Sequence, residues 1–589
     1  MSKARRKTHK TGSMNRLVRE SLILSCTRKL SSRFVRFFES GFASPLLTSA
    51  KKVNRFVRQR VTGPIFNKLG VRRNVAMPAR NSVAGFVENN AITRFVIKLR
   101  DFLLNASMRT AGVFMFTFGL YAAAIYVLKN YVSLGGYGIN PDDFTVASVV
   151  LLFGLILTMF GDKKILTTLG NSKIVGPLLY NSLGINDSSF IRRSKDKMKS
   201  AIGYAFLCGT LFGSATLFVA PIKVLLFLLY IITFAVIINI PEFGILLAVI
   251  TLSFLPAGVV SAISSITLLS YFFKCVRLKR NFRFGTADAM FLLTYACLFV
   301  ASAVSGADIS QGESYLLTFA ALYFAVKNSL CSEKLVVQTF NALCLSAEIG
   351  MALYILGDFA TLLPYTQLRK FAILLSQNTM SPQIITVLVA AALPFALSSF
   401  SKAVERKPRR LFLLLALGTA VAIDSIPFYV MLVVSILVYT SFAYKAPFGA
   451  VLGGAIIIPP MLVIAKMLGV SGSESFFGEG RIDACFEIAK NLSLESFWAG
   501  LFEVGGAVSS LLLVLSGLLI FQRVIGSYVG ENGTPLAIYG GTVTASAVMM
   551  VLCTFGINMF ADVRILALLW FILGLCGSVY KLAYRPNVE

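Results

Sequence analysis

Long apolar runs recur along this chain from residue 111 to its C-terminal end, and this pattern limits the possible folds more than any other feature. Hydrophobic residues make up 56% of the 589 residues, and charged residues make up only 14%. A soluble protein carries about a quarter charged residues, and an apolar run of about 20 residues can cross a bilayer as a helix. The sequence therefore predicts an all-α, polytopic membrane protein.

The apolar runs predict about sixteen transmembrane helices. The predicted spans cover residues 111–131, 145–161, 201–220, 222–240, 242–256, 257–274, 286–304, 313–328, 334–355, 383–400, 411–424, 426–443, 449–466, 505–522, 536–555 and 563–580. They divide the chain into an N-terminal arm (1–110), a group of N-terminal transmembrane helices (111–220) and a larger transmembrane body (221–589). Because the first strong run begins near residue 111, no cleavable signal peptide is expected.

Residues 1–110 form a basic arm, with 24 Lys and Arg against 4 Asp and Glu, so 24 − 4 = +20 of the chain's net charge of +29 lies there. Segments such as KKVNRFVRQRVTGPIFNKL mix cations with apolar residues at helical spacing. Such segments bind the surface of an anionic membrane, with the apolar face buried and the cations at the headgroups. We therefore expect anionic lipids rather than nucleic acid as the partner of this amphipathic arm, although partner docking or disorder would also fit it.

The charges of the loops orient the predicted spans, because Lys and Arg concentrate in cytoplasmic loops. With the arm inside, the basic segments 162–200, 276–284, 401–410 and 581–589 all fall on the cytoplasmic side. The acidic loops GGYGINPDD and GADISQGE fall outside. Both termini are thus predicted to be cytoplasmic, and residues 467–504 are predicted to form an outer loop.

The outer loop 467–504 and the start of the next span contain an unusually polar stretch for this chain, GEGRIDACFEIAKNLSLESFWAGLFEVGG, at residues 478–506. It is the most charged of the predicted outer segments. The only histidine of the chain is His9, and the nine cysteines form no Cys-x-x-Cys pair. The sequence therefore predicts no metal site, no cofactor and no disulfide framework.

Four short motifs in the second half of the chain carry a family resemblance. SPQIITVLVAAALPFAL opens a predicted span at Pro382 and has a second proline at Pro394. RIDACFEIAKNLSLESFWAG begins with Arg481, FEVGG follows with Glu503, and FADVRILALLWFILGL has Arg564 at the mouth of the last span. With these motifs, residues 222–581 resemble the bacterial O-antigen ligase/polymerase family of membrane glycosyl-transfer proteins.

The resemblance implies a function in surface-polysaccharide assembly. Members of this family transfer or polymerise glycan from a polyprenyl-pyrophosphate donor at the outer face of the bacterial plasma membrane. A lipid-linked glycan and other polysaccharide-assembly proteins are the partners that the resemblance implies. The family has about twelve spans with its large outer loop before the last three, and here three predicted spans also follow residues 467–504.

Two departures from the family's pattern keep other functions open. The family usually carries a long insert with a catalytic histidine after the Arg-led helix, whereas here only Leu501 and Phe502 separate Gly500 from Glu503. The family's Ser-Arg-Gly motif is replaced by Asp-Ser-Ile at residues 424–426. A non-catalytic scaffold or donor-binding subunit, or a transporter or flippase for a lipid-linked glycan, are the alternatives.

The candidate substrate-binding residues are the cations of the predicted outer face. Fixed cations stabilise a departing pyrophosphate, because Arg–phosphate contacts strengthen as charge develops. Arg481 is the first candidate, with a surface or capping role as its alternative. Arg369, Lys370 and Arg564 are further candidates, and each of the arginines could instead mark the membrane interface, where cations snorkel.

The candidate catalytic residues are Glu503 and Asp483, because a carboxylate must act as the base where no histidine is present. The alternative for Glu503 is a carboxylate that stabilises the start of a helix. Glu348 lies within a predicted span, where a carboxylate is costly and usually functional. Its alternatives are a position near the interface or an ion pair with a neighbouring span, and Asp424 is a similar case near the end of a span.

Overall fold

A computed structural model of the chain describes residues 90, 94, 106–132, 141–165, 168, 171–172, 202–277, 282, 286–305, 311–362, 369, 380–401, 404, 408–423, 425–443, 511–514, 516, 535–556 and 563–584. Its helices are α7 (Met108–Val132), α8 (Pro141–Met159), α12 (Ile202–Ser214), η4 (Ala215–Leu217), α13 (Pro221–Asn239), α14 (Pro241–Thr251), α15 (Ala257–Val276), α16 (Thr286–Ser305), α17 (Gln311–Ser329), α18 (Glu333–Leu362), α20 (Pro382–Ser398), α21 (Arg410–Ile423), α22 (Ile426–Ala443), α26 (Pro535–Gly556) and α27 (Val563–Tyr584). The described residues contain no β-strand, so the all-α class is confirmed for them.

The helices follow the predicted spans closely. Every predicted span up to residue 443, and each of the last two, coincides with a helix. The main difference is α18, which continues to Leu362, beyond the predicted end at residue 355. The predicted span 449–466 lies outside the described residues, and 505–522 is described only at 511–514 and 516. Most of the arm 1–110 also lies outside them.

Seven helices among the described residues are long and apolar enough to cross a membrane. They are Met108–Tyr131, Pro141–Met159, Pro221–Asn239, Ala257–Val276, Glu333–Ala360, Pro535–Thr554 and Val563–Leu582. Five shorter apolar helices accompany them, at Ile202–Leu217, Pro241–Thr251, Pro382–Ser398, Arg410–Ile423 and Phe428–Ala443. The chain is therefore a multi-pass membrane protein.

Proline sets the starting point of several of these helices. A proline in the first turn costs no hydrogen bond, because the first N–H groups of a helix have no partner within it. The helices α8, α13, α14, α20 and α26 all begin at a proline. At the other end of α8, the turn at Gly161 has a positive φ of 67°, which glycine adopts without strain.

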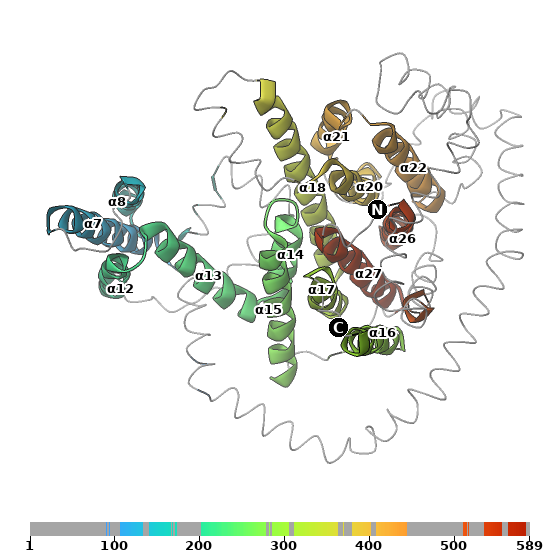
Figure 1. Ribbon diagram of the computed structural model, residues 1–589, viewed down its shortest axis with the longest axis horizontal. Helices are drawn as coiled ribbons and strands as arrows, with labels where there is room; N and C mark the ends of the chain where they lie inside the picture. Colours follow the sequence, from blue (N-terminus) through green and yellow to red (C-terminus); the bar gives the residue numbers. More distant parts are fainter. Residues whose placement is uncertain are drawn as a thin grey trace, which may run out of the picture.

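The helices α7, α8 and α12 form an N-terminal unit at one end of the molecule, and α13 runs from them to the other helices (Figure 1). Glycines bring the backbones of this unit into contact. A Cβ on Gly119 would lie 2.6 Å from the Leu151 nitrogen, and one on Gly112 would lie 2.5 Å from the Thr158 nitrogen. The pairing of residue 112 with 158 and of 119 with 151 shows that α7 and α8 are antiparallel.

A Gly-x-x-x-Gly pair, Gly209 and Gly213, packs α12 against α7. Gly209 contacts Phe114 and Thr117 of α7, and Gly213 lies against Tyr121. Because both partners advance in the same direction, α12 and α7 are parallel. Small residues at this spacing let transmembrane helices approach closely, and van der Waals packing then holds them together.

The C-terminal core consists of α14 to α27 and holds most of the buried side chains. In α26 and α27, 67% of the spanning residues are buried, compared with 17% in α8. Trp570 of α27 lies at the centre of an aromatic cluster, with its ring centroid 5.0 Å from that of Phe291 and 5.9 Å from that of Tyr323. The core therefore depends on side-chain packing between many helices.

Serine hydroxyls from two neighbouring helices bind carbonyl groups of α20 close to Pro394. Proline has no N–H, so the Ala390 carbonyl four residues earlier loses its helical partner. Ser435 of α22 donates a hydrogen bond of 2.8 Å to the Ala390 carbonyl. Ser546 of α26 donates one of 2.8 Å to the Ala391 carbonyl. The proline thus becomes the point where α20, α22 and α26 are joined.

Close contacts give the relative directions of two pairs of core helices. Gly574 of α27 lies against Tyr323 and Val326 of α17, and Gly577 lies against Lys327, so α17 and α27 are parallel. Glu242 at the start of α14 pairs with Lys274 at the end of α15, so these two helices are antiparallel.

Candidate functional site

Asp288 and Lys327 form the most buried ion pair of the described residues. Asp288 lies in the first turn of α16 and has no exposed surface, and Lys327 lies in the last turn of α17. The ammonium group of Lys327 contacts both carboxylate oxygens of Asp288. The hydroxyl of Tyr323 donates a further hydrogen bond of 2.7 Å to Oδ1 of Asp288. Both oxygens of this carboxylate therefore have a hydrogen-bonding partner.

The neighbours of this pair leave it little exposed surface, none on Asp288 and 11% on the side chain of Lys327. A Cβ at Gly577 would lie 3.0 Å from Cγ of Lys327, so the absence of a side chain there lets the lysine pass across α27. Phe291 lies one turn after Asp288 and has a centroid distance of 5.3 Å to Tyr323. In such a setting, removing one member of a pair leaves an uncompensated buried charge.

Glu348 and Arg409 form a second buried pair, at the middle of α18. Glu348 lies fifteen residues after Glu333 and fourteen before Leu362 in this helix of 30 residues. At 1.5 Å per residue, it is about 22 Å from one end and about 21 Å from the other. Nη1 of Arg409 lies 3.4 Å and 3.3 Å from the two carboxylate oxygens. The alternative of an ion pair with a neighbouring helix is thus the observed arrangement for Glu348.

Arg409 is held in place by backbone contacts as well as by the carboxylate. Its Nη2 donates to the Asn341 carbonyl at 3.3 Å, and its own backbone N–H donates to Oγ of Ser399 at 3.0 Å. The sequence placed Arg409 in a cytoplasmic loop, residues 401–410. In the structure it is buried directly before α21, because α21 begins beside the middle of α18.

The helices α18 and α21 run in the same direction beside this pair. Arg409 lies beside Glu348, and nine residues later Gly418 lies against Ile355, with 3.2 Å between the isoleucine Cδ1 and a Cβ built on the glycine. A shift of α21 along α18 would therefore break the ion pair. The pair is a polar contact within an apolar helix bundle, and such groups are functional by default.

Glu242 and Lys274 form a third pair, which is more exposed. Their side chains are 13% and 19% exposed, and Nζ of Lys274 lies 3.3 Å from Oε2 of Glu242. The pair joins the first turn of α14 to the last turn of α15. Both groups keep more exposed surface than Asp288 or Glu348, so this pair is a weaker candidate for chemistry than the other two.

Among the residues predicted from the sequence to form a site, Arg369 and Arg564 belong to the described part of the chain. Arg369 is a half-buried helical position, and Arg564 is the half-buried second residue of α27. Lys370, Arg481, Asp483 and Glu503 lie outside the described residues, as does Asp424. Their roles stay predictions.

The sequence did not single out Asp288, Lys327 or Arg409. Each lies at the edge of an apolar run, where a charged residue normally faces the headgroups. The sequence feature that could have indicated the Asp288–Lys327 pair is the placement of its charges. An Asp at the start of one apolar run and a Lys at the end of the next can meet when the two helices pack antiparallel. The burial of Arg409 could not be read from its basic neighbours.

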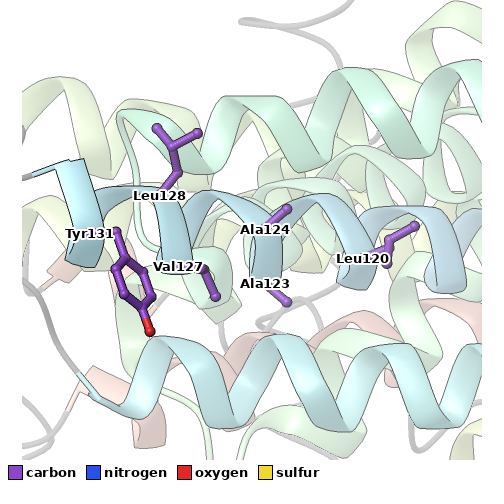
Figure 2. A pocket seen from close by; sticks show the side chains of 6 residues that line it. All are labelled: Leu120, Ala123, Ala124, Val127, Leu128 and Tyr131. Carbon is purple, nitrogen blue, oxygen red and sulfur yellow. The ribbon is translucent and has the colours of Figure 1, made fainter.

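An apolar groove of about 550 Å³ lies along α7 (Figure 2). Its lining comes from one stripe of the helix: Leu120, Ala123, Ala124, Val127, Leu128 and Tyr131. The Tyr131 hydroxyl is the only polar side-chain group among them. A surface of this kind suits acyl chains and cannot orient a polar substrate, so we do not place the candidate site there.

The described residues contain no group of three or more His, Cys, Asp or Glu side chains that could hold a metal ion. No family model, no curated protein and no solved structure matches the chain.

Proposed function

We propose that the protein assembles surface polysaccharide, by transferring or polymerising glycan from a polyprenyl-pyrophosphate donor at the outer face of a bacterial plasma membrane. The observation that carries this proposal is the charged stretch with Arg481 between two apolar segments, in a region that resembles the O-antigen ligase/polymerase family. Such a protein would be a metal-independent glycosyl transferase with both termini in the cytoplasm.

The packing of α22 against α26 supports an outer position for residues 467–504. A Cβ on Gly541, near the start of α26, would lie 3.1 Å from Cα of Ala443, the last residue of α22. The chain thus leaves and returns at the same end of the molecule between residues 443 and 535. Two apolar runs, 449–466 and 505–522, flank the charged stretch, so one crossing in each direction would carry that stretch to the opposite side.

The proposed chemistry needs a cation for the pyrophosphate and a base for the acceptor hydroxyl. Arg481 would bind the departing pyrophosphate, with Arg369, Lys370 and Arg564 as further cations at the outer face. Glu503 or Asp483 would accept the proton of the hydroxyl that attacks the sugar. Pyrophosphate is a good leaving group, so this scheme requires no metal in principle.

The test compares cells that lack the gene with the same cells expressing the wild type, Arg481→Ala or Lys490→Ala. The two substitutions remove cations from the same segment, but only Arg481 is proposed to contact the donor. We expect the deletion and Arg481→Ala to shorten the surface polysaccharide and to raise the pool of lipid-linked glycan, while Lys490→Ala restores both. Membrane fractions must contain all variants at equal levels.

The other outcomes of this test are equally informative. If Arg481→Ala behaves as the wild type, the stretch does not bind the donor phosphate. If the deletion abolishes the polysaccharide while both variants restore it, a scaffold or donor-binding subunit is the better description. If neither polymer length nor donor pool responds to the deletion, the protein does not act in this process.

Transport of a lipid-linked glycan is the second candidate, and the Glu348–Arg409 pair at the middle of α18 favours it. Intramembrane ion pairs of this kind are typical of substrate and proton pathways. Purified protein in vesicles would then move a fluorescent polyprenyl-pyrophosphate glycan between leaflets without forming a glycosidic bond. Bond formation without leaflet transfer would support the transferase instead.

A further inference from the structure

We propose that Glu348 is a proton-binding site, at which uptake of a proton breaks the ion pair with Arg409. The proposal goes beyond glycan transfer and does not depend on it. It is carried by the position of the carboxyl group, by the geometry of its single contact and by the contrast with Asp288.

The position of Glu348 makes its ionised form dependent on one partner. The carboxylate is buried at the middle of α18, and Arg409 is its only hydrogen-bonding partner among the described residues. An isolated carboxylate in an apolar medium takes up a proton rather than keep its charge. The charged state of Glu348 therefore lasts only while Arg409 stays beside it.

The contact with Arg409 is long for a charge-assisted hydrogen bond. The two N···O distances are 3.3 Å and 3.4 Å, and strong N⁺–H···O⁻ bonds measure about 2.7–2.9 Å. Both bonds come from the same nitrogen, so the two-pronged geometry of a guanidinium group is not used. Nη2 instead donates to the Asn341 carbonyl, which Arg409 keeps when the carboxylate becomes neutral.

Asp288 provides the contrast within the same molecule. Lys327 contacts both of its oxygens, and the Tyr323 hydroxyl donates to one of them. Hydrogen bonds to the charged form of a carboxyl group favour that form. The two buried carboxylates of the core therefore differ in their contacts, because Lys327 and Tyr323 both hold Asp288, whereas Glu348 is held by a single nitrogen of Arg409.

No other ionisable group among the described neighbours replaces Arg409. The helix α20 has no ionisable residue, and the only one in α14 is Glu242, which pairs with Lys274. Arg410, the first residue of α21, is exposed. On α18, Cys344 lies one turn before Glu348, and Tyr354 and Asp358 lie further along. The ionisable residues of α27 are Arg564, Cys576, Tyr580 and Lys581.

Two further buried hydroxyl groups near the middle of α18 lie on the side of the helix away from Glu348, because residues two apart do not face each other, and they offer the carboxylate no alternative partner. Ser346 Oγ and Ser253 Oγ are buried and form no hydrogen bond with the described residues. Ser253 packs against Gly350, which lies one turn after Ser346 on the same side of α18. Proton uptake would remove the negative charge of Glu348, so the ion pair that joins α18 to the residue before α21 would be lost.

The test uses dicyclohexylcarbodiimide, an apolar reagent that modifies protonated carboxyl groups in membrane proteins. The full-length protein in lipid vesicles is treated between about pH 5 and about pH 9, and the adducts are located by peptide mass spectrometry. We expect modification of Glu348 at acidic pH. Its rate should fall about tenfold for each pH unit once most of the carboxyl groups are ionised. Asp288 should stay unmodified.

Two variants sharpen the result. Arg409→Gln removes the cation that favours the carboxylate, so modification of Glu348 should persist to higher pH than in the wild type. Glu348→Gln should remove the adduct from the α18 peptide and leave the other peptides unchanged. An absence of adduct at Glu348 at every pH in both wild type and Arg409→Gln would overturn the proposal. Equal modification of Asp288 and Glu348 would overturn it as well.

Discussion

The N-terminal unit and the C-terminal core use opposite means to bring apolar helices together. In the N-terminal unit, glycines allow α7, α8 and α12 to touch through their backbones, and few side chains are buried. In the core, aromatic side chains, serine hydroxyls and ion pairs lie between the helices. Lipid is as apolar as leucine, so helices in a membrane associate through close packing or through polar contacts. The N-terminal unit depends mainly on glycine contacts, whereas the core adds buried polar contacts to the glycine contacts of α26 and α27.

This division also separates the regions by their capacity for chemistry. A glycine contact leaves no functional group between the helices, so the N-terminal unit can anchor or position but offers little to a substrate. The core contains Asp288, Lys327, Glu348 and Arg409 in buried positions. Polar function within the described part of the chain is therefore concentrated in the core.

The largest effect should follow the loss of one partner from the most buried ion pair. Lys327→Met leaves Asp288 charged and buried, which costs about 3–5 kcal/mol of folding free energy. The double variant Asp288→Asn, Lys327→Met removes the stranded charge and keeps an acceptor for Tyr323, so it should recover most of this loss. SDS-induced unfolding from mild detergent measures both. A single variant as stable as the wild type would show that the pair is not buried in the folded protein.

The next largest effect should come from filling a glycine contact in the N-terminal unit. Gly154→Leu forces a side chain into the backbone of Phe116, and overpacking of this kind costs about 1–3 kcal/mol. Gly203→Leu on α12 is the matched control, because nothing lies within 4 Å of a Cβ there. Hydrogen exchange should speed up in α7 and α8 and stay unchanged in α26 and α27. Faster exchange in all four helices would contradict the independence of the two regions.

The sequence predicted the helices well because bilayer thickness fixes their length and proline marks several of their starts. It also identified Glu348, because a carboxylate inside an apolar run stands out. Its partner could not be found, because Arg409 lies 61 residues away in a segment that reads as a basic loop. Asp288 and Lys327 were missed for a related reason, since charges at the edges of apolar runs are ordinary until helix packing buries them.

The Pro394 junction offers a smaller and more specific test of how the core is joined. Ser435→Ala should cost about 0.6 kcal/mol, the average for a hydrogen bond between transmembrane helices. In a Pro394→Ala background, residue 394 regains an N–H for the Ala390 carbonyl, so the same serine substitution should cost less. A double-mutant cycle on unfolding free energies measures the difference. Equal costs in both backgrounds would mean that the proline does not create the need for Ser435.

The smallest effect is expected at Glu242 and Lys274, which share the geometry of the Asp288–Lys327 pair. In each case a carboxylate in the first turn of one helix meets a lysine in the last turn of the next described helix. The difference is exposure, because Glu242 is 13% and Lys274 19% exposed, whereas Asp288 has no exposed surface and Lys327 is 11% exposed. Lys274→Met should therefore change the unfolding free energy by less than about 0.5 kcal/mol, and added salt should reduce the change further. A loss as large as that of Lys327→Met would mean that helix-end geometry, and not burial, determines the strength of these pairs.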